Sequence, residues 1–416
     1  MTLDARDLLN SAVGRHLCLA YLESLACVED IEEDTSAAGE FQRSLRTASM
    51  VIDLSQGSST VFGWDPYGRL LDQEAFLQHL TEEAKSKGLV GPAAGPNLAR
   101  QIARIELTEI GDLQLMQALS KATNAVHFWG QSPTGEEILM NGPEPTSAML
   151  RVAHHIIESA ASSWWYEPWA PCEQWLVRPV NAMNGEEPFE LEPKTLREHE
   201  SITVLIEDAF DQAEREASAR KHRQLGPQEP LGDVWWSFPA FLLEKTTSLI
   251  PGIGPVDLYC CEDSHGEDTK VAWKVSSAGQ RIFEVADAED WVRLCAWYPQ
   301  EVTATKLDMW EKNTRRRGRW VVPDWLKMAS DFDGVHLSAA AYISLAGTAI
   351  PVRGLGAEGE WASSITGWTP DWTFHFTQIR VDVESRQVWQ LDDNSPGPIW
   401  ERARGVGPDG RWGRSE

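Results

Sequence analysis

The sequence predicts an α+β protein with a helix-rich N-terminal region and a tryptophan-rich C-terminal domain built on a mixed sheet. In the first half of the 416 residues, long segments repeat apolar residues with helical spacing. In the second half, short apolar runs alternate with helical segments without a regular β-α-β order. Because the chain is long for one hydrophobic core, we expect domains at 1–182 and 233–416, joined by a polar helical linker at 183–232.

The composition limits the kinds of partner. Hydrophobic residues make up 42% of the chain and charged residues 24%, as in ordinary globular proteins. A net charge of −26 disfavours nucleic acid and anionic membranes as partners. The six cysteines lack the paired spacing of a zinc site, and no apolar run reaches the length of about 18 residues needed to span a bilayer. We therefore expect a cytoplasmic protein without a metal or other cofactor, and its oligomeric state stays open.

The first half is expected to be mainly helical. An amphipathic helix is predicted over 3–33, where apolar residues recur every three or four positions. The other predicted elements are strands at 49–54 and 60–63, helices near 73–87, 96–107, 110–124 and 145–163, a strand at 174–179, and a long charged helix at 195–222.

The second half mixes shorter elements. Predicted strands cover 255–262, 270–275, 280–286, 334–338, 365–368, 372–377 and 386–391. Predicted helices cover 288–297 and 323–331. This order favours a mixed sheet over a doubly wound parallel sheet.

Twenty tryptophans are present, and fourteen of them lie from Trp235 onward. Most are expected in the core, because a tryptophan ring is large and apolar. The adjacent Trp235 and Trp236 cannot both point inward if they lie on a strand, since neighbouring strand residues face opposite sides. We therefore predict a ligand-binding wall made of Trp235, Trp236, Ser237, Trp368 and Trp372.

Two adjacent carboxylates, Glu262 and Asp263, follow the predicted strand at 255–262. Loops at strand ends often hold functional groups. Neighbouring carboxylates raise one another's pKa and can supply a general acid and a general base. The pair is therefore a catalytic candidate, and the alternative is a solvated turn.

The segment 331–338 places Asp331, Asp333 and His336 around an Asp-Gly turn between a predicted helix and a predicted strand. A second aromatic turn at 367–372 carries Asp371. Carboxylates beside an imidazole can perform acid–base chemistry. These four residues complete the catalytic candidates, with turn formation and packing as the alternative.

Several of these motifs resemble a group of uncharacterised proteins from high-GC Gram-positive bacteria. The resemblance is carried by the Trp-Trp-Ser-x-Pro motif at 235–239, the Asp-Gly-Val-His-Leu-Ser motif at 333–338 and the Gly-Trp-x-Pro-Asp motif at 367–371. It implies a bacterial cytoplasmic protein and carries no activity. A shorter Trp-Trp-x-x-Pro match at 164–168 leaves open a duplication.

A looser likeness is to the NAD site of ADP-ribosyltransferases. That family uses strand hydroxyls, an aromatic clamp on nicotinamide and a late catalytic glutamate. Ser237 and the run 246–248 could supply the hydroxyls, and a tryptophan the clamp. The sequence departs from the family at the decisive position, where only Asp371 stands in place of the glutamate.

The first functional hypothesis is a cytosolic enzyme or small-molecule-binding protein with a tryptophan-lined site in the C-terminal half. Its groups suit transferase or hydrolase chemistry by carboxylates and histidine. The competing hypothesis is a non-catalytic, immunity-like or regulatory protein whose acidic surface binds a basic protein partner. An ADP-ribosyltransferase-like NAD-binding protein is the third.

Overall fold

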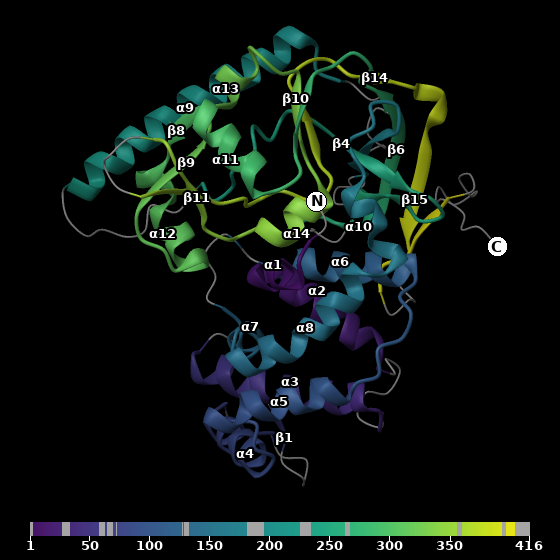
Figure 1. Ribbon diagram of the computed structural model, residues 1–416, viewed down its shortest axis with the longest axis vertical. Coiled ribbons are helices and arrows are strands. Elements are labelled where there is room, and N and C mark those ends of the chain that lie inside the picture. Colours follow the sequence, from purple (N-terminus) through teal and green to yellow (C-terminus); the bar gives the residue numbers. More distant parts are fainter. Residues whose placement is uncertain are drawn as a thin grey trace. The chain divides into compact units, whose positions relative to one another are not determined.

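The computed structural model describes residues 3–26, 34–57, 63–64, 70–71, 73–126, 128, 133–180, 195–224, 234–262, 267–355, 360–392 and 397–403. The protein is α+β, with helices concentrated in the first half and mixed sheets in the second (Figure 1). It divides into two compact units. The helical unit is Asp4–Ala118 with Gln131–Ser162, and the sheet unit is Met1–Leu3 with Leu119–Gly130 and Ser163–Glu416.

The helical unit is built from amphipathic helices. Its elements are α1 Ala5–Asn10, α2 Ala12–Ser24, α3 Ala37–Ser55, β1 Gly63–Trp64, β2 Leu70–Leu71, α4 Gln73–Ser86, η1 Gly91–Ala93, α5 Ala94–Arg104, the start of α6 Asp112–Ala125, α7 Gly135–Met140 and α8 Pro143–Ile157. Helix α5 packs on α8, and α3 packs on α5 and α7. Leu98 and Ile102 of α5 are fully buried and lie four residues apart, so one face of this helix enters the core.

The strand predicted at 49–54 is wrong, because these residues form the end of α3. Phe41, Leu45 and Ala48 are buried along one face of that helix, and the helical spacing continues to Leu54. The apolar run at 49–54 therefore belongs to a helix whose beginning lies twelve residues upstream.

The single helix predicted over 3–33 is instead two helices, α1 and α2. The Ser11 hydroxyl accepts a hydrogen bond from the amide of Gly14 (2.8 Å) and so caps α2. An added side chain at Gly14 would meet the carbonyl oxygen of Leu8, so the two helices approach closely at this point. The strand predicted at 60–63 lies outside the described residues except for its last position.

The larger sheet of the sheet unit has ten strands. They are β3 Gln174–Pro179, β4 Glu244–Ile250, β5 Gly254–Pro255, β6 Thr269–Ser276, β7 Ile282–Val285, β10 Gly334–Leu337, β13 Thr373–His375, β14 Arg380–Val381, β15 Gln387–Leu391 and β16 Trp400–Arg402. The main order is β16-β15-β6-β3-β4-β13-β10-β7, with β14 beside β6 and β5 beside β4. Only β10 and β7 pair in parallel among these described strands.

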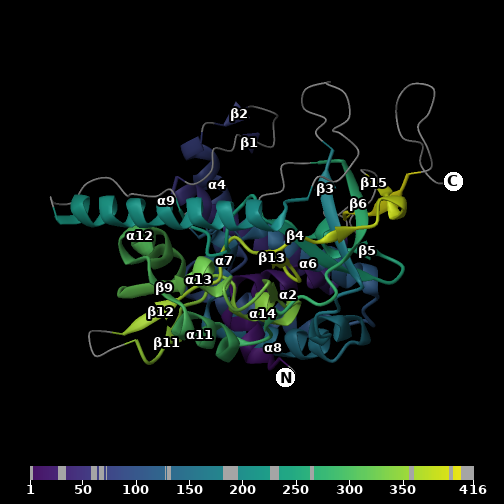
Figure 2. The ribbon, with the colours of Figure 1, turned by 90° about the horizontal axis from the view of Figure 1, so that it is seen from above.

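A second, four-stranded sheet and several helices complete this unit. The strands, in the order β11-β12-β9-β8, are β11 Ile350–Val352, β12 Trp361–Ser363, β9 Arg319–Pro323 and β8 Pro299–Glu301. The helices are α9 Glu198–Gln224, α10 Val256–Tyr259, α11 Ala288–Trp297, α12 Thr303–Thr314, α13 Trp325–Met328, α14 Ala339–Leu345 and η3 Val383–Ser385, and η2 Ala160–Tyr166 crosses from one unit to the other. Helix α9 packs along α12 and α13 (Figure 2).

This division differs from the predicted domains at 1–182, 183–232 and 233–416. Strand β3 lies inside the larger sheet, between β6 and β4, although its residues precede the predicted boundary. Helix α9, which was assigned to the linker, packs on α12 and α13. The physical reason is the same for both elements, since each buries residues against partners that come much later in the chain.

The strand predicted at 255–262 is also wrong. Residues 256–259 form the short helix α10, which follows Pro255. The amine of Lys270 donates hydrogen bonds to the carbonyls of Asp257 (2.9 Å) and Leu258 (3.2 Å), and so binds acceptors at the end of this helical turn. The apolar residues that suggested a strand are indeed buried, but they lie in a helical turn whose carbonyl oxygens bind Lys270.

Most other predicted elements are confirmed. Predicted helices correspond to α4, α5, α6, α8, α9 and α11, and predicted strands to β3, β6, β7, β10, β13 and β15. The helix predicted at 323–331 is the shorter α13, and the strand predicted at 365–368 is reduced to one bridge between Ala346 and Ile365. No helix in the described ranges is long and apolar enough to cross a membrane.

Candidate functional site

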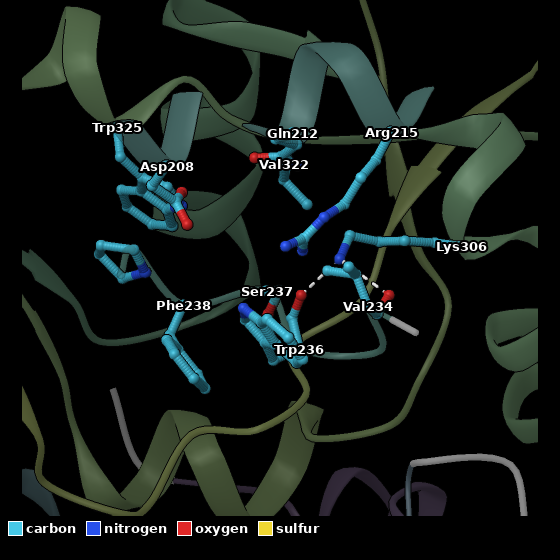
Figure 3. Close-up of a pocket in the computed structure, with 11 residues that line it drawn as sticks. Asp208, Gln212, Arg215, Val234, Trp236, Ser237, Phe238, Lys306, Val322 and Trp325 are labelled. Carbon is cyan, nitrogen blue, oxygen red and sulfur yellow. Dashed lines mark hydrogen bonds between the residues drawn. The ribbon is translucent and has the colours of Figure 1, made fainter. Parts of the chain in front are cut away.

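A pocket of the sheet unit gathers charged and aromatic side chains from five segments (Figure 3). The empty space within it and in front of its mouth, open solvent included, is about 330 Å³. The lining residues are Asp208, Gln212 and Arg215 of α9, Val234, Trp236, Ser237, Phe238 and Pro239 of the segment before β4, Lys306 of α12, Val322 of β9 and Trp325 of α13.

The segment before β4 is held in place through its backbone. Lys306 donates to the carbonyl oxygens of Val234 (3.3 Å) and Trp236. The indole of Trp310 donates to the carbonyl oxygen of Trp235 (2.9 Å). Side chains of α12 thus bind the carbonyl oxygens of three successive residues, 234–236. These bonds hold the backbone, so the Trp236 side chain keeps a defined position in the pocket wall.

Ser237 joins the same segment to residues 366–368. Its hydroxyl accepts a hydrogen bond from the amide of Thr366 (3.0 Å) and another from the indole of Trp368 (3.2 Å). Its own amide donates to the carbonyl of Thr366 (2.9 Å). Ser237 is therefore buried and links the pocket segment to the aromatic core.

Helix α9 supplies the opposite wall. Asp208, Gln212 and Arg215 are four and three residues apart, so they lie on one face of the helix. Next along this face, the buried Glu216 accepts hydrogen bonds from the amides of Ala304 (2.9 Å) and Thr305 (3.0 Å) at the start of α12. This carboxylate binds unsatisfied amides of a helix N-terminus and joins the two walls.

The charges in the pocket are perturbed by burial. Lys306 is 1% exposed, and burial lowers its pKa to about 7, although Asp208 and Glu216 favour the charged amine and Arg215 opposes it. Burial raises the pKa of Asp208 to about 6, against the effects of Lys306 and Arg215. The pocket therefore holds two basic groups close together, with one acid that is easily neutralised.

Of the predicted ligand-binding residues, Trp236 and Ser237 line this pocket. Trp235 contributes its carbonyl oxygen as an acceptor for Trp310. Trp368 is fully buried behind the wall. Trp372 lies away from the pocket, where its indole donates to Asp257 (2.7 Å).

The structure brings two of the predicted catalytic residues together. Nε2 of His336 lies 3.9 Å from Oδ1 of Asp371. The Asp371 carboxylate accepts hydrogen bonds from the Thr247 hydroxyl (2.8 Å), the Ser248 amide (2.5 Å) and the Ser248 hydroxyl (3.2 Å). Burial raises the pKa of Asp371 to about 6, and its backbone is left-handed, with φ of 67°.

This pair belongs to a polar row that crosses the larger sheet. Nδ1 of His336 is 2.9 Å from the hydroxyl of Thr373, which is its cross-strand neighbour. The next strand places Thr246 beside Thr373, and the Thr246 hydroxyl is 2.8 Å from Nε2 of His375. The row is buried and its histidines are neutral, because burial lowers the pKa of His336 and of His375 to about 3.

The sheet separates this row from Trp368 and Trp372, two of the predicted ligand-binding residues. Thr373 and Phe374 are adjacent on β13 and point to opposite faces. His336 lies beside Thr373, whereas Trp368 and Trp372 pack on the ring of Phe374. His336 therefore does not share a pocket with either tryptophan.

The remaining predicted carboxylates are structural or peripheral. Glu262 is buried and accepts hydrogen bonds from the Tyr342 hydroxyl (2.8 Å) and the Gly367 amide (3.0 Å). Asp331 is exposed and accepts from the Tyr298 hydroxyl (2.7 Å). Asp263 lies outside the described residues.

Asp333 is bound through both its side chain and its backbone. Its carboxylate accepts from the Arg281 amide (2.7 Å), and its own amide donates to the Arg281 carbonyl (2.8 Å). These bonds tie the start of β10 to the start of β7. The same motif ends at Ser338, whose hydroxyl caps α14 by accepting from the Ala341 amide (3.2 Å).

We expect His336→Gln to change the pH dependence of stability. His336 is neutral in the folded protein, with a pKa near 3 against 6.5 when unfolded. Its contribution is present above pH 6.5 and is lost as pH falls, because the unfolded chain binds a proton that the folded chain does not. The stability difference between wild type and variant should fall by up to about 1.4 kcal/mol per pH unit below 6.5. Urea unfolding from pH 7.5 to 5.5 measures it.

The exposed His154 offers a matched control for this experiment. His154→Gln should leave the difference from wild type nearly constant over the same pH range, because this side chain is solvated in the folded and in the unfolded chain. A pH-independent difference for His336→Gln would contradict the neutral, buried imidazole.

The sequence hypotheses missed Lys306, Asp208 and Arg215. The spacing of Asp208, Gln212 and Arg215 was a visible signal of one helical face, but the helix was interpreted as a linker. Lys306 had no local signal, since a lysine in a polar helix is usually exposed.

No protein family, curated protein sequence or solved structure shows significant similarity to this chain.

Proposed function

We propose that this chain binds a small anionic ligand with a planar apolar part in the pocket of Lys306. The observation that carries the proposal is the convergence of two basic side chains, from α9 and α12, on a cavity with three aromatic side chains. This makes specific the hypothesis of a small-molecule site lined by tryptophan. Ligand sites commonly combine apolar walls with a few polar groups that orient the ligand.

The anionic group would lie between Arg215 and Lys306. Two neighbouring cations repel each other, and Arg215 contributes to the lowered pKa of Lys306. An anion between them would relieve this repulsion and favour protonated Lys306. The Arg215 side chain reaches from α9 into the pocket, where its planar guanidinium can bind a carboxylate or phosphate through two parallel hydrogen bonds (Figure 3).

The planar part of the ligand would contact Trp236, Phe238 and Trp325. Trp236 and Phe238 have nearly parallel rings, 19° apart, with centroids separated by 5.9 Å. Such rings offer apolar contact area, and an indole face also binds flat groups. An aromatic carboxylate or aryl phosphate therefore fits the site better than a simple inorganic ion.

Catalysis is the second candidate function for the same pocket. Asp208 has a pKa near 6 and Lys306 a pKa near 7, so each can exchange a proton near neutral pH. Groups tuned in this way are typical of general acids and bases. This supports acid–base transfer or hydrolysis as the reaction class, with Asp208 and Lys306 in place of the predicted carboxylate and histidine groups.

Titration of tryptophan fluorescence with benzoate and phenyl phosphate tests the binding proposal. Arg215→Gln should weaken binding about ten-fold or more, the usual cost of losing a charge-assisted bidentate contact. Affinity for benzoate should rise from pH 8 to pH 6, because Lys306 gains its proton and Asp208 begins to lose its charge. Arg215 is exposed, so this variant should fold.

Lys221→Gln is the matched control, because Lys221 is an exposed cation of the same helix and does not line the pocket. It should leave the affinity for both probes unchanged. Equal binding by wild type and Arg215→Gln, or equal binding of uncharged benzyl alcohol and benzoate, would overturn the proposal.

A further inference from the structure

The face of α9 that points away from the pocket is apolar. Ile206, Phe210, Ala213 and Ala217 are spaced by four, three and four residues, so they form one stripe along the helix. Ile206 is 51% exposed and Phe210 is 68% exposed. Both alanines are exposed as well. A solvated helix face is normally polar, and large exposed apolar side chains in a row mark a contact surface.

The stripe is independent of the face that holds α9 in the fold. The buried residues of α9 are Ser201, Leu205, Glu216 and Ala219. Ile206 and Phe210 each lie two residues from Asp208, one before it and one after it. Two residues turn a helix by about 200°, so both side chains point to the side opposite the pocket. The helix therefore has one side committed to α12 and the pocket, and another with no packing role in the described residues.

An acidic row borders the stripe. Glu207, Asp211 and Glu214 are spaced by four and three residues and are all exposed. None of them forms an ion pair with a described residue. Like charges three or four residues apart destabilise a helix slightly, and a basic partner would relieve this repulsion.

We propose that this face of α9 is a docking surface for a basic, amphipathic helical segment of another protein. The partner's apolar side would cover Phe210 and Ile206, and its Lys or Arg residues would face Glu207, Asp211 and Glu214. The small side chains of Ala213 and Ala217 let a partner helix approach closely beside the Phe210 ring. The net charge of −26 adds long-range attraction for a basic partner.

A second copy of this chain fits the surface less well. Two identical helices that pair antiparallel about a two-fold axis present the same flank on the same side. The acidic row of one copy would then face the acidic row of the other. Charge complementarity therefore selects a basic partner, and the stripe of 206–217 requires about 16 Å of partner helix.

A labelled synthetic helical peptide of leucine and lysine, about four turns long, is the probe, with fluorescence anisotropy as the readout. Wild type should bind it and should not bind the same peptide with glutamate in place of lysine. Phe210→Ser and Ile206→Ser together should weaken binding about ten-fold or more, as expected when the apolar centre of an interface is removed. Both residues are exposed, so the fold should persist.

Charge reversal provides the matched control. Asp211→Lys with Glu214→Lys should weaken binding about ten-fold, whereas Glu106→Lys with Glu109→Lys, which changes the net charge equally on another exposed surface, should weaken it less than about three-fold. Similar losses from the two pairs, or full binding by the Phe210→Ser variant, would overturn the proposal. So would a dimer of wild type that Phe210→Ser dissociates.

The result is separable from the pocket proposal. Phe210 does not line the pocket, so Phe210→Ser should keep wild-type affinity for benzoate. Arg215→Gln in turn leaves the apolar stripe intact and should retain most of the peptide binding. Each proposal can therefore fail without the other.

Discussion

Trp368→Ala should lower the free energy of unfolding by about 3–5 kcal/mol, the range measured for large aromatic residues removed from cores. Trp368 is fully buried. Its ring centroid lies 6.2 Å from those of Trp291 and Trp325 and 5.0 Å from that of Phe374. The variant leaves a cavity between these rings and also removes the indole donor to Ser237. Urea unfolding followed by circular dichroism measures the loss.

Trp297→Ala is the control for that prediction. Trp297 is 56% exposed and contacts Phe283 at its edge, so its loss should cost much less than the loss of Trp368. Comparable losses in the two variants would contradict the packing seen around Trp368. The wall of the pocket depends on the same contacts, so Trp368→Ala should also weaken benzoate binding.

Glu216→Ala should destabilise the protein by about 3 kcal/mol, because it leaves buried hydrogen-bond donors without an acceptor. The carboxylate accepts from the amides of Ala304 and Thr305 and from the Thr305 hydroxyl (3.0 Å), and it pairs with Arg220 (3.1 Å). Removal uncouples α9 from the start of α12. Chemical denaturation measures the loss.

Glu216→Gln should cost less than Glu216→Ala, since an amide oxygen can still accept from the same donors. Glu214→Ala, which removes an exposed carboxylate two residues away, should change stability by less than about 0.5 kcal/mol. If Glu216→Ala were as mild as Glu214→Ala, the capping of α12 by this side chain would be wrong.

Elements with strong local patterns were predictable. Helices such as α4 and α11 follow from their apolar spacing, and α11 also begins at Asp287, whose side chain accepts from the amides of Glu289 and Asp290. For short apolar runs, the sequence alone does not distinguish a strand from a helix. Residues 49–54 and 256–259 were predicted as strands but are helical, since a run of that length fits either structure.

The candidate site was predictable only in part. Trp236 and Ser237 stood out because paired tryptophans are rare, and both line the pocket. His336 and Asp371 stood out as chemically active types, and they lie close together but in a buried polar row. Asp208 and Lys306 were missed. Their pKa values are perturbed by burial between α9 and α12, two helices that lie far apart in the sequence.

Composition and periodicity were sufficient for the α+β class, for the long helices and for the acidic character of the chain, because these are properties of neighbouring residues or of their sum. The placement of β3 beside β4 and β6, the pocket between α9 and α12, and the side of the sheet that His336 faces came only from the fold. Each of these depends on contacts between distant segments, and a side chain's burial, partners and charge state follow from those contacts.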